Sequence, residues 1–202
     1  MQKKKLVIFD FDGVIEDTFE LSFGFFREQF PNLTHDEYRT WFDDNFYKVI
    51  KEKNISINVG AYYRKYDTAL KKREISPNIK KALESLHGDF SLAVVSSSFD
   101  GTLIRYLKRN GISHIFDHVW GATVHKSKVE KLKGLMNVHA VEPDQCRFIT
   151  DTLGDIREAW EAGIQSIAVT WGFHPRERLE SGHPAAIVAT PQELMGYLEK
   201  NF

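Results

Sequence analysis

The chain has almost no cysteine. Cys146 is the only one in 202 residues, so a disulfide within one chain is excluded. No apolar run approaches the roughly 18 residues that a membrane span needs. Neither sign of charge dominates, because the formal net charge is −1, and nothing in this balance favours a nucleic acid as partner. With no signal-peptide pattern and so little thiol, the sequence predicts a cytoplasmic protein without membrane attachment.

The residues that are present have the composition of an ordinary globular protein. Hydrophobic residues make up 42% of the chain and charged residues 27%. A length of 202 residues is enough for one α/β domain with an insertion or for two small domains. We find no internal repeat and no low-complexity segment.

The most informative segment is an apolar run, Leu6 to Phe9, followed at once by Asp10, Asp12 and Gly13. A short run without polar residues is typical of a central strand in a parallel sheet, buried on both faces. The carboxyl edge of such a sheet is where open α/β proteins bind ligands. Two carboxylates so close together resist joint ionisation, so the pair predicts a bound cation or a shared proton there. The alternative is a simple turn, which Asp and Gly also favour.

Residues 14–75 contain no strand pattern, but aromatic residues recur there at helical spacing. Three stretches show this period, and we expect about three helices that build a small core of their own. The apolar positions are Phe19, Phe23, Phe26 and Phe30; then Tyr38, Trp41, Phe42, Phe46 and Val49; then Tyr62, Tyr63, Tyr66, Ala69 and Leu70. The sequence therefore predicts a catalytic core formed by residues 1–14 and 76–202, with a helical cap over residues 15–75.

From Ser76 onward, strand and helix patterns alternate. This alternation predicts an α/β fold with a parallel sheet in three layers. Strands are expected at 91–95, 145–150, 166–170 and 187–189, with a short strand within 116–122, and helices from Pro77 and over 100–110, 127–137, 154–162 and 191–200.

Polar residues follow two further strands of the predicted sheet. Ser96 and Ser97 come directly after residues 91–95, and Asp151 follows residues 145–150, with Asp155 four positions later. Because parallel strands end at the same edge, these groups should meet the first two aspartates. Hard carboxylate oxygens suit Mg²⁺, and hydroxyl donors with a nearby lysine suit phosphate. The sequence thus predicts a magnesium and phosphate site.

Several motifs together resemble the haloacid dehalogenase superfamily, in its phosphatase branch with a helical cap inserted after the first strand. They are the segments 10–18 (DFDGVIEDT), 94–97 (VVSS) and 149–156 (ITDTLGDI); the tail segments 170–173 (TWGF) and 191–194 (PQEL) are similar to phosphoglycolate-phosphatase-like members. The resemblance covers essentially the whole chain and implies a three-layer Rossmann-like core. Thr150 stands where the family usually has glycine.

The resemblance also implies residue roles. Asp10 would be the nucleophile that forms an aspartyl-phosphate, and Asp12 the acid and base whose backbone carbonyl also ligates Mg²⁺. Ser96 and the N–H of Ser97 would hold the phosphoryl group.

A lysine would neutralise the transferred group, and we favour Lys128 over Lys126. Asp10, Asp12, Asp151 and Asp155 would form the metal site. The implied function is Mg²⁺-dependent hydrolysis of a small phosphorylated metabolite. A sugar phosphomutase that uses the same intermediate and a non-enzymatic phosphoryl-binding module stay open. The sequence indicates neither the substrate nor the oligomeric state.

Overall fold

The computed structural model describes residues 5–202. One six-stranded sheet, parallel throughout, lies at its centre in the order β3-β2-β1-β4-β5-β6. The strands are β1 (Leu6–Phe9), β2 (Ser91–Val95), β3 (His118–Trp120), β4 (Cys146–Thr150), β5 (Gln165–Val169) and β6 (Ala186–Val188). The predicted three-layer α/β fold is confirmed, and the first strand of the chain is central in the sheet.

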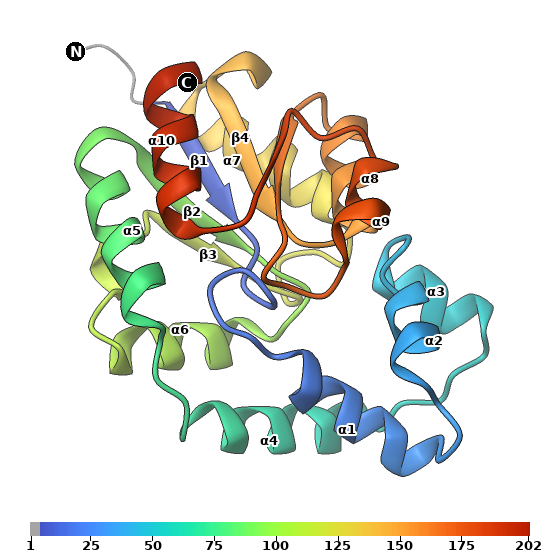
Figure 1. Cartoon of the computed structure of the whole chain (residues 1–202). Helices are drawn as coiled ribbons and strands as arrows, with labels where there is room; N and C mark the ends of the chain where they lie inside the picture. The colour runs from blue at the N-terminus through green and yellow to red at the C-terminus, as the bar shows by residue number, and fades with distance from the viewer. Residues whose placement is uncertain (1–4) are drawn as a thin grey trace.

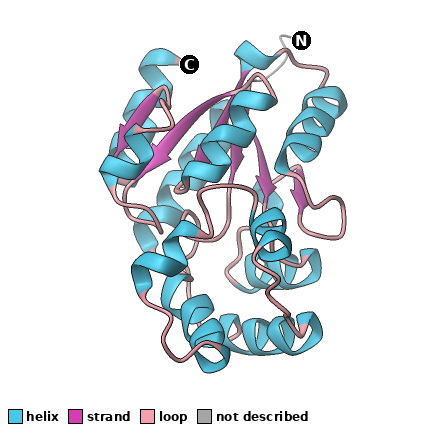
Figure 2. Cartoon of the chain, turned by 90° about the vertical axis from the view of Figure 1, so that its right-hand side faces the viewer, coloured by secondary structure: helices cyan, strands magenta, loops and turns pink. Residues whose placement is uncertain are grey.

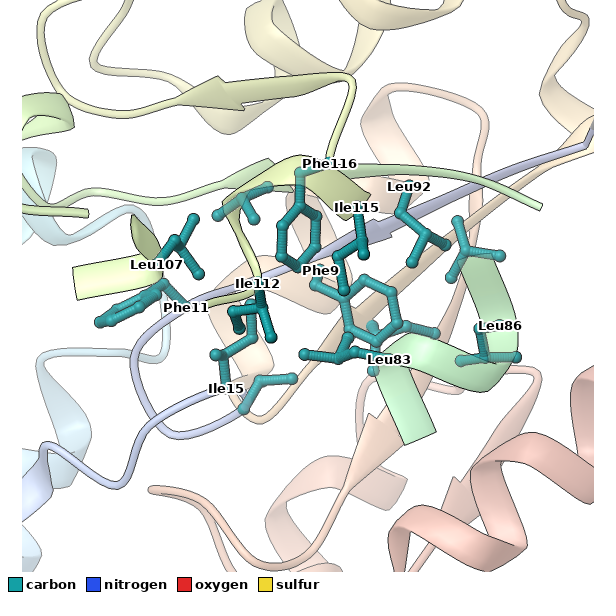
Figure 3. Packing of buried hydrophobic residues seen from close by; sticks show 14 of the residues in the cluster. Phe9, Phe11, Ile15, Leu83, Leu86, Leu92, Leu107, Ile112, Ile115 and Phe116 are labelled. Atoms are coloured by element: carbon teal, nitrogen blue, oxygen red, sulfur yellow. The ribbon is translucent and has the colours of Figure 1, made fainter. Parts of the chain in front are cut away.

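Helices cover both faces of this sheet because successive strand residues point to opposite sides. Val7 and Phe9 face one side, where they pack with α5 (Pro77–Asp89), α6 (Asp100–Arg109) and α10 (Pro191–Asn201). Figure 3 shows part of this core, in which Phe9 of β1, Leu83 of α5 and Leu107 of α6 belong to one cluster. On the other side, α7 (Lys128–His139) and α8 (Leu153–Glu161) pack against Leu6 and Ile8.

Residues 15–75 contain helices and no strand, and the structure describes all of them. The helices are α1 (Phe19–Gln29), α2 (His35–Thr40), α3 (Phe46–Glu52) and α4 (Val59–Leu70). Figure 1 shows them in blue to teal below the sheet, and in Figure 2 the strand arrowheads point toward this part of the molecule. We call residues 15–75 the helical insertion; its standing as a separate domain stays a prediction.

The prediction of three helices in the insertion was wrong, because the second stretch divides into α2 and α3. Asn45 ends the intervening turn, and its side-chain oxygen accepts hydrogen bonds from the N–H groups of Tyr47 and Lys48. A side chain that caps a new helix in this way stops the previous helix from continuing. The aromatic rings still form one cluster, which also takes in Phe173 from the core.

Smaller differences concern short elements. The short strand expected within 116–122 covers 118–120, whereas helix α9 (Arg176–Glu180) was not predicted. Five residues are too few to show a helical period. Two 3₁₀ turns, Ser113–Ile115 and Pro143–Gln145, complete the described elements. Over residues 5–202, no helix combines the length and the apolarity needed to cross a membrane.

Candidate active site

Three buried carboxylates meet at the carboxyl edge of the sheet. Asp10 follows β1, Asp151 follows β4, and Asp155 lies in the first turn of α8. One oxygen from each lies within 4.8 Å of the others, and we call these three residues the carboxylate cluster. Because β1 and β4 are adjacent and in register, Phe9 beside Ile149, their ends deliver the two aspartates together. The structure therefore brings together three of the four acidic residues predicted for the metal site, and Asp12 is the exception.

Lys128 joins two members of the cluster. Its Nζ donates to Oδ2 of Asp10 at 2.8 Å and to Oδ2 of Asp155 at 2.6 Å, and all three side chains are buried. Lys126 is exposed instead, with its Nζ 4.1 Å from the centre of the Tyr47 ring. The geometry therefore favours Lys128 as the lysine of the site.

The charges of the site do not balance among the described side chains. Three carboxylates face one ammonium group, which leaves two negative charges in a buried place if all are ionised. Burial accordingly raises the pKa of Asp10 and of Asp151. The pKa of Asp155 is lowered, because the charge of Lys128 and hydrogen bonds to the carboxylate outweigh the opposing effect of burial.

The cluster has the features expected of a divalent-cation site. Oδ2 of Asp151 accepts the N–H of Phe173 at 2.7 Å, whereas its buried Oδ1 has no hydrogen-bond partner among residues 5–202. Two glycines make room for this side chain: a Cβ on Gly13 would lie 1.9 Å from Oδ2, and one on Gly172 would lie 2.3 Å from it. A free hard oxygen and an excess of two negative charges fit an ion such as Mg²⁺.

Asp12 lies apart from the cluster and is held by hydroxyl groups. Its Oδ1 accepts from Thr18 Oγ1 at 2.7 Å and from the hydroxyl of Tyr66, and its Oδ2 accepts from Ser98 Oγ at 2.8 Å. Ser96 Oγ lies 3.3 Å from the same Oδ2. These donors fix the carboxylate in place, and they come both from the core and from the insertion.

The serines after β2 are brought to the site, but they face different ways. Ser96 is fully buried, and its Oγ accepts the N–H of Ser98 at 2.9 Å. Among the described residues, Ser97 and Ser98 line the cavity above the cluster, and Ser96 does not. Contact between Ser96 and a phosphoryl group therefore stays a prediction.

Several residues of the site were not predicted from the sequence, among them Thr18 and Ser98, which donate to Asp12. The hydroxyl of Thr150 donates to Asp155 Oδ2 at 2.7 Å, so this departure from the family pattern adds a hydrogen bond. The buried Lys131 donates to the carbonyl of Ser96 at 2.5 Å. Its spacing of three from Lys128 places both on one face of α7, which is a usable signal. Another is Tyr66, which no local pattern links to the first strand.

A cavity lies between the cluster and the insertion. The core lines one end and the insertion lines the rest. Its lining residues are Asp10, Asp12, Ser22, Phe26, Tyr38, Phe42, Asp44, Phe46, Tyr47, Ile57, Val59, Tyr62, Tyr63, Ser97, Ser98, Lys128, Thr152, Asp155, Glu158 and Phe173. A small molecule could thus reach Asp10 and Lys128 while its far end contacts the insertion.

Comparisons with known proteins agree with this fold and site. The chain is 24% identical to a phosphoglycolate phosphatase from Synechococcus elongatus, over 94% of each chain. It is also 24% identical to the pyrophosphatase PpaX from Oceanobacillus iheyensis, over 98% of each chain. Its fold is similar to that of a haloacid dehalogenase-like hydrolase from Streptococcus pneumoniae, with a TM-score of 0.80 and 23% identity, covering 98% of this chain and 100% of that one.

The family model described as haloacid dehalogenase-like hydrolase matches residues 7–169, from β1 to the end of β5. This span contains the carboxylate cluster, the serines after β2 and the whole insertion. The resemblance inferred from the motifs is confirmed, and the chain belongs to the haloacid dehalogenase-like hydrolases.

Proposed function

We propose that this hydrolase is a Mg²⁺-dependent phosphatase that acts on a small phosphorylated metabolite through an aspartyl-phosphate. The observation that carries the proposal is the cluster of Asp10, Asp151 and Asp155 within 4.8 Å, bridged by Lys128. The names of the relatives, a phosphoglycolate phosphatase and a pyrophosphatase, support phosphoryl chemistry. A cytoplasmic location stays a prediction, supported by the single buried cysteine.

Asp10, Asp151, Asp155 and the backbone carbonyl of Asp12 would hold the ion. When bound, Mg²⁺ would offset the charge of the carboxylates and of the phosphoryl oxygens. Lys128 would contribute a further positive charge at the same place. Phosphoryl transfer needs mainly alignment and charge stabilisation, and these buried, mutually bonded groups are suited to both.

In the first step a carboxylate oxygen of Asp10 attacks phosphorus, and the bond from phosphorus to the ester oxygen breaks. Asp12 gives that oxygen a proton, so the alcohol leaves neutral. In the second step water attacks the same phosphorus, Asp12 takes up a proton from the water, and the bond to Asp10 breaks. Inorganic phosphate is released and both aspartates return to their starting forms.

The test is phosphate release from a panel of metabolite phosphates, with and without Mg²⁺, by the natural chain and by Asp10→Asn. We expect release that depends on Mg²⁺ in the natural chain and none in the variant, with unchanged circular dichroism. A phosphoprotein that is stable in acid and destroyed by hydroxylamine would identify the intermediate. Turnover retained by Asp10→Asn would refute the assignment of the nucleophile.

The same panel separates the other functions. A phosphomutase would convert one hexose phosphate into another and release little phosphate. A phosphoryl-binding module would bind phosphate but turn over no ester in the presence of Mg²⁺.

A further inference from the structure

Charge is distributed unevenly in the cavity above the carboxylate cluster. Lys128 is the one cation among the described residues that line it, and it already pairs with Asp10 and Asp155. Beyond the cluster and Asp12, the acidic side chains of Asp44 and Glu158 also line the cavity. A substrate that carried a second negative charge beyond its phosphate would therefore meet repulsion and find no free cation.

Two lysines that contact lining residues already have partners within the protein. Lys48 pairs with Asp44 at 2.5 Å, and Lys126 lies against the ring of Tyr47 without belonging to the lining. Burying an anionic group without a partner is costly, whereas an uncharged group loses little. The alcohol part of the substrate should thus be uncharged.

The insertion lines the cavity with aromatic rings. Phe42 and Phe46 stack at 5.4 Å between ring centres, and each side chain is only half-buried. The full set of rings in the lining is Phe26, Tyr38, Phe42, Phe46, Tyr47, Tyr62, Tyr63 and Phe173. Rings that face a cavity favour an apolar ligand, above all a ring-bearing one.

The hydroxyl groups of two of these tyrosines are used within the protein. Tyr47 donates to the carbonyl of Ser97 at 2.6 Å, and the hydroxyls of Tyr47 and Tyr63 lie 3.3 Å apart. These hydrogen bonds hold the rings in place and occupy their hydroxyl groups. The cavity wall therefore presents ring faces to a substrate more than it presents free hydrogen-bonding groups.

Resting on the proposed function, we infer that the substrate is a phosphate monoester of an uncharged, ring-bearing, apolar alcohol. Phosphate would lie at Asp10 and Lys128, and the ring would lie against Phe42 and Phe46. Phosphoglycolate, named for the relative from S. elongatus, carries a carboxylate beside its ester and lacks a ring. The cavity of this chain is poorly suited to such a molecule.

A matched pair of esters tests the inference. Benzyl phosphate and 4-carboxybenzyl phosphate have the same ring and a similar leaving alcohol, and they differ by one carboxylate. We expect kcat/KM for benzyl phosphate to exceed that for the carboxylated ester by about tenfold or more, since the added charge has no partner. Phosphoglycolate should be slower still. Tyr63→Arg adds a cation to the wall, so it should reduce the difference in kcat/KM between benzyl phosphate and 4-carboxybenzyl phosphate.

Two variants distinguish the contribution of the cavity wall to KM from that of the rest of the insertion. Phe46→Ala should raise KM for benzyl phosphate about tenfold by removing a ring from the wall. Phe30→Ala is the matched control, because Phe30 packs on Trp41 and is not part of the lining, and it should leave KM unchanged. Equal effects of the two variants, or a preference for the carboxylated ester, would overturn the inference while the phosphatase stands.

Binding gives a measurement that does not depend on turnover. Calorimetry with benzylphosphonate and 4-carboxybenzylphosphonate, in the presence of Mg²⁺, should show at least tenfold tighter binding of the uncharged analogue. If no ester is hydrolysed but this preference is found, the proposed phosphatase fails and the selectivity of the cavity is retained. If the two analogues bind equally, the inference fails whatever the activity.

Discussion

Acidification should destabilise the fold at His174, whose neutral ring accepts a hydrogen bond from the core and donates one to helix α2. This side chain is 1% exposed, and it joins two elements that are distant in sequence. Its Nδ1 accepts the N–H of Leu153 at 3.0 Å, and its Nε2 lies 2.9 Å from the carbonyl of Arg39. A carbonyl can only accept, so Nε2 carries the hydrogen and the neutral ring satisfies both partners. A second proton would set an N–H on Nδ1 against the N–H of Leu153.

The size of this loss of stability follows from the pKa of His174. Burial lowers the pKa of His174 from 6.5 to about 4, although the Arg39 carbonyl and the charges of Asp43 and Asp155 act to raise it; Arg178 acts with burial. The unfolded chain takes up a proton near pH 6.5 and the folded chain only near pH 4. Stability from the neutral ring is therefore complete above pH 6.5 and is lost as the pH falls to 4. The loss amounts to about 3 kcal/mol of unfolding free energy.

The free energy of unfolding should be measured in urea at steps from pH 7.5 to pH 4, for the natural chain and for His174→Asn. The amide oxygen of asparagine can accept the same N–H of Leu153 but does not titrate. Carboxylates titrate in both proteins, so they cancel in the difference between the two free energies. We expect that difference to change by about 3 kcal/mol between pH 6.5 and pH 4. A difference that stays constant across this range would refute the reasoning.

Three further predictions concern the site itself. Tyr66→Phe removes a hydroxyl donor to Asp12, so it should lower kcat about tenfold and shift the pH profile of kcat. The free energy of unfolding in urea should fall by about 1 kcal/mol. An unchanged pH profile would contradict a positioning role for Tyr66. Lys128→Met should lower kcat by about a hundredfold or more. Calorimetry should still detect Mg²⁺ binding to this variant, because the three carboxylates remain. Nearly normal turnover would contradict the role of Lys128 in charge stabilisation. Gly13→Ala places a Cβ on a residue with φ +76°, only 1.9 Å from an oxygen of Asp151, so it should lower the free energy of unfolding by about 2 kcal/mol or more. Gly24→Ala, in open space on α1, should instead raise it by about 0.5–1 kcal/mol. Similar effects of the two substitutions would exclude the steric explanation.

Much of the fold was predictable because its signals are local. The run Leu6–Phe9 has no polar residue and is fully or almost fully buried. Gly111 and Gly163 follow α6 and α8 with φ of +73° and +79°, as expected for residues just past a helix end. The division between α2 and α3 was not predicted, because aromatic residues at helical spacing continue across the turn that Asn45 caps.

The site was predictable where it depends on strand ends. Asp10 and Asp151 follow adjacent parallel strands, so the alternation of elements alone brings them together. The choice between Lys126 and Lys128 depends on the start of α7, which the sequence places only to within a residue or two. The contact of Tyr66 with Asp12 could not be found in this way, because it spans 54 residues and depends on how α4 packs on the core.

That contact also connects specificity with catalysis. Helix α4 supplies Tyr62 and Tyr63 to the cavity wall and Tyr66 to the carboxylate of Asp12. A substrate that displaces the wall therefore acts on the same rigid helix that positions the proposed acid and base. Because the helix carries both contacts, a misfit at the ring end of a substrate should reduce kcat as well as raise KM. Selection by the cavity would then apply to the chemical step itself, in addition to binding.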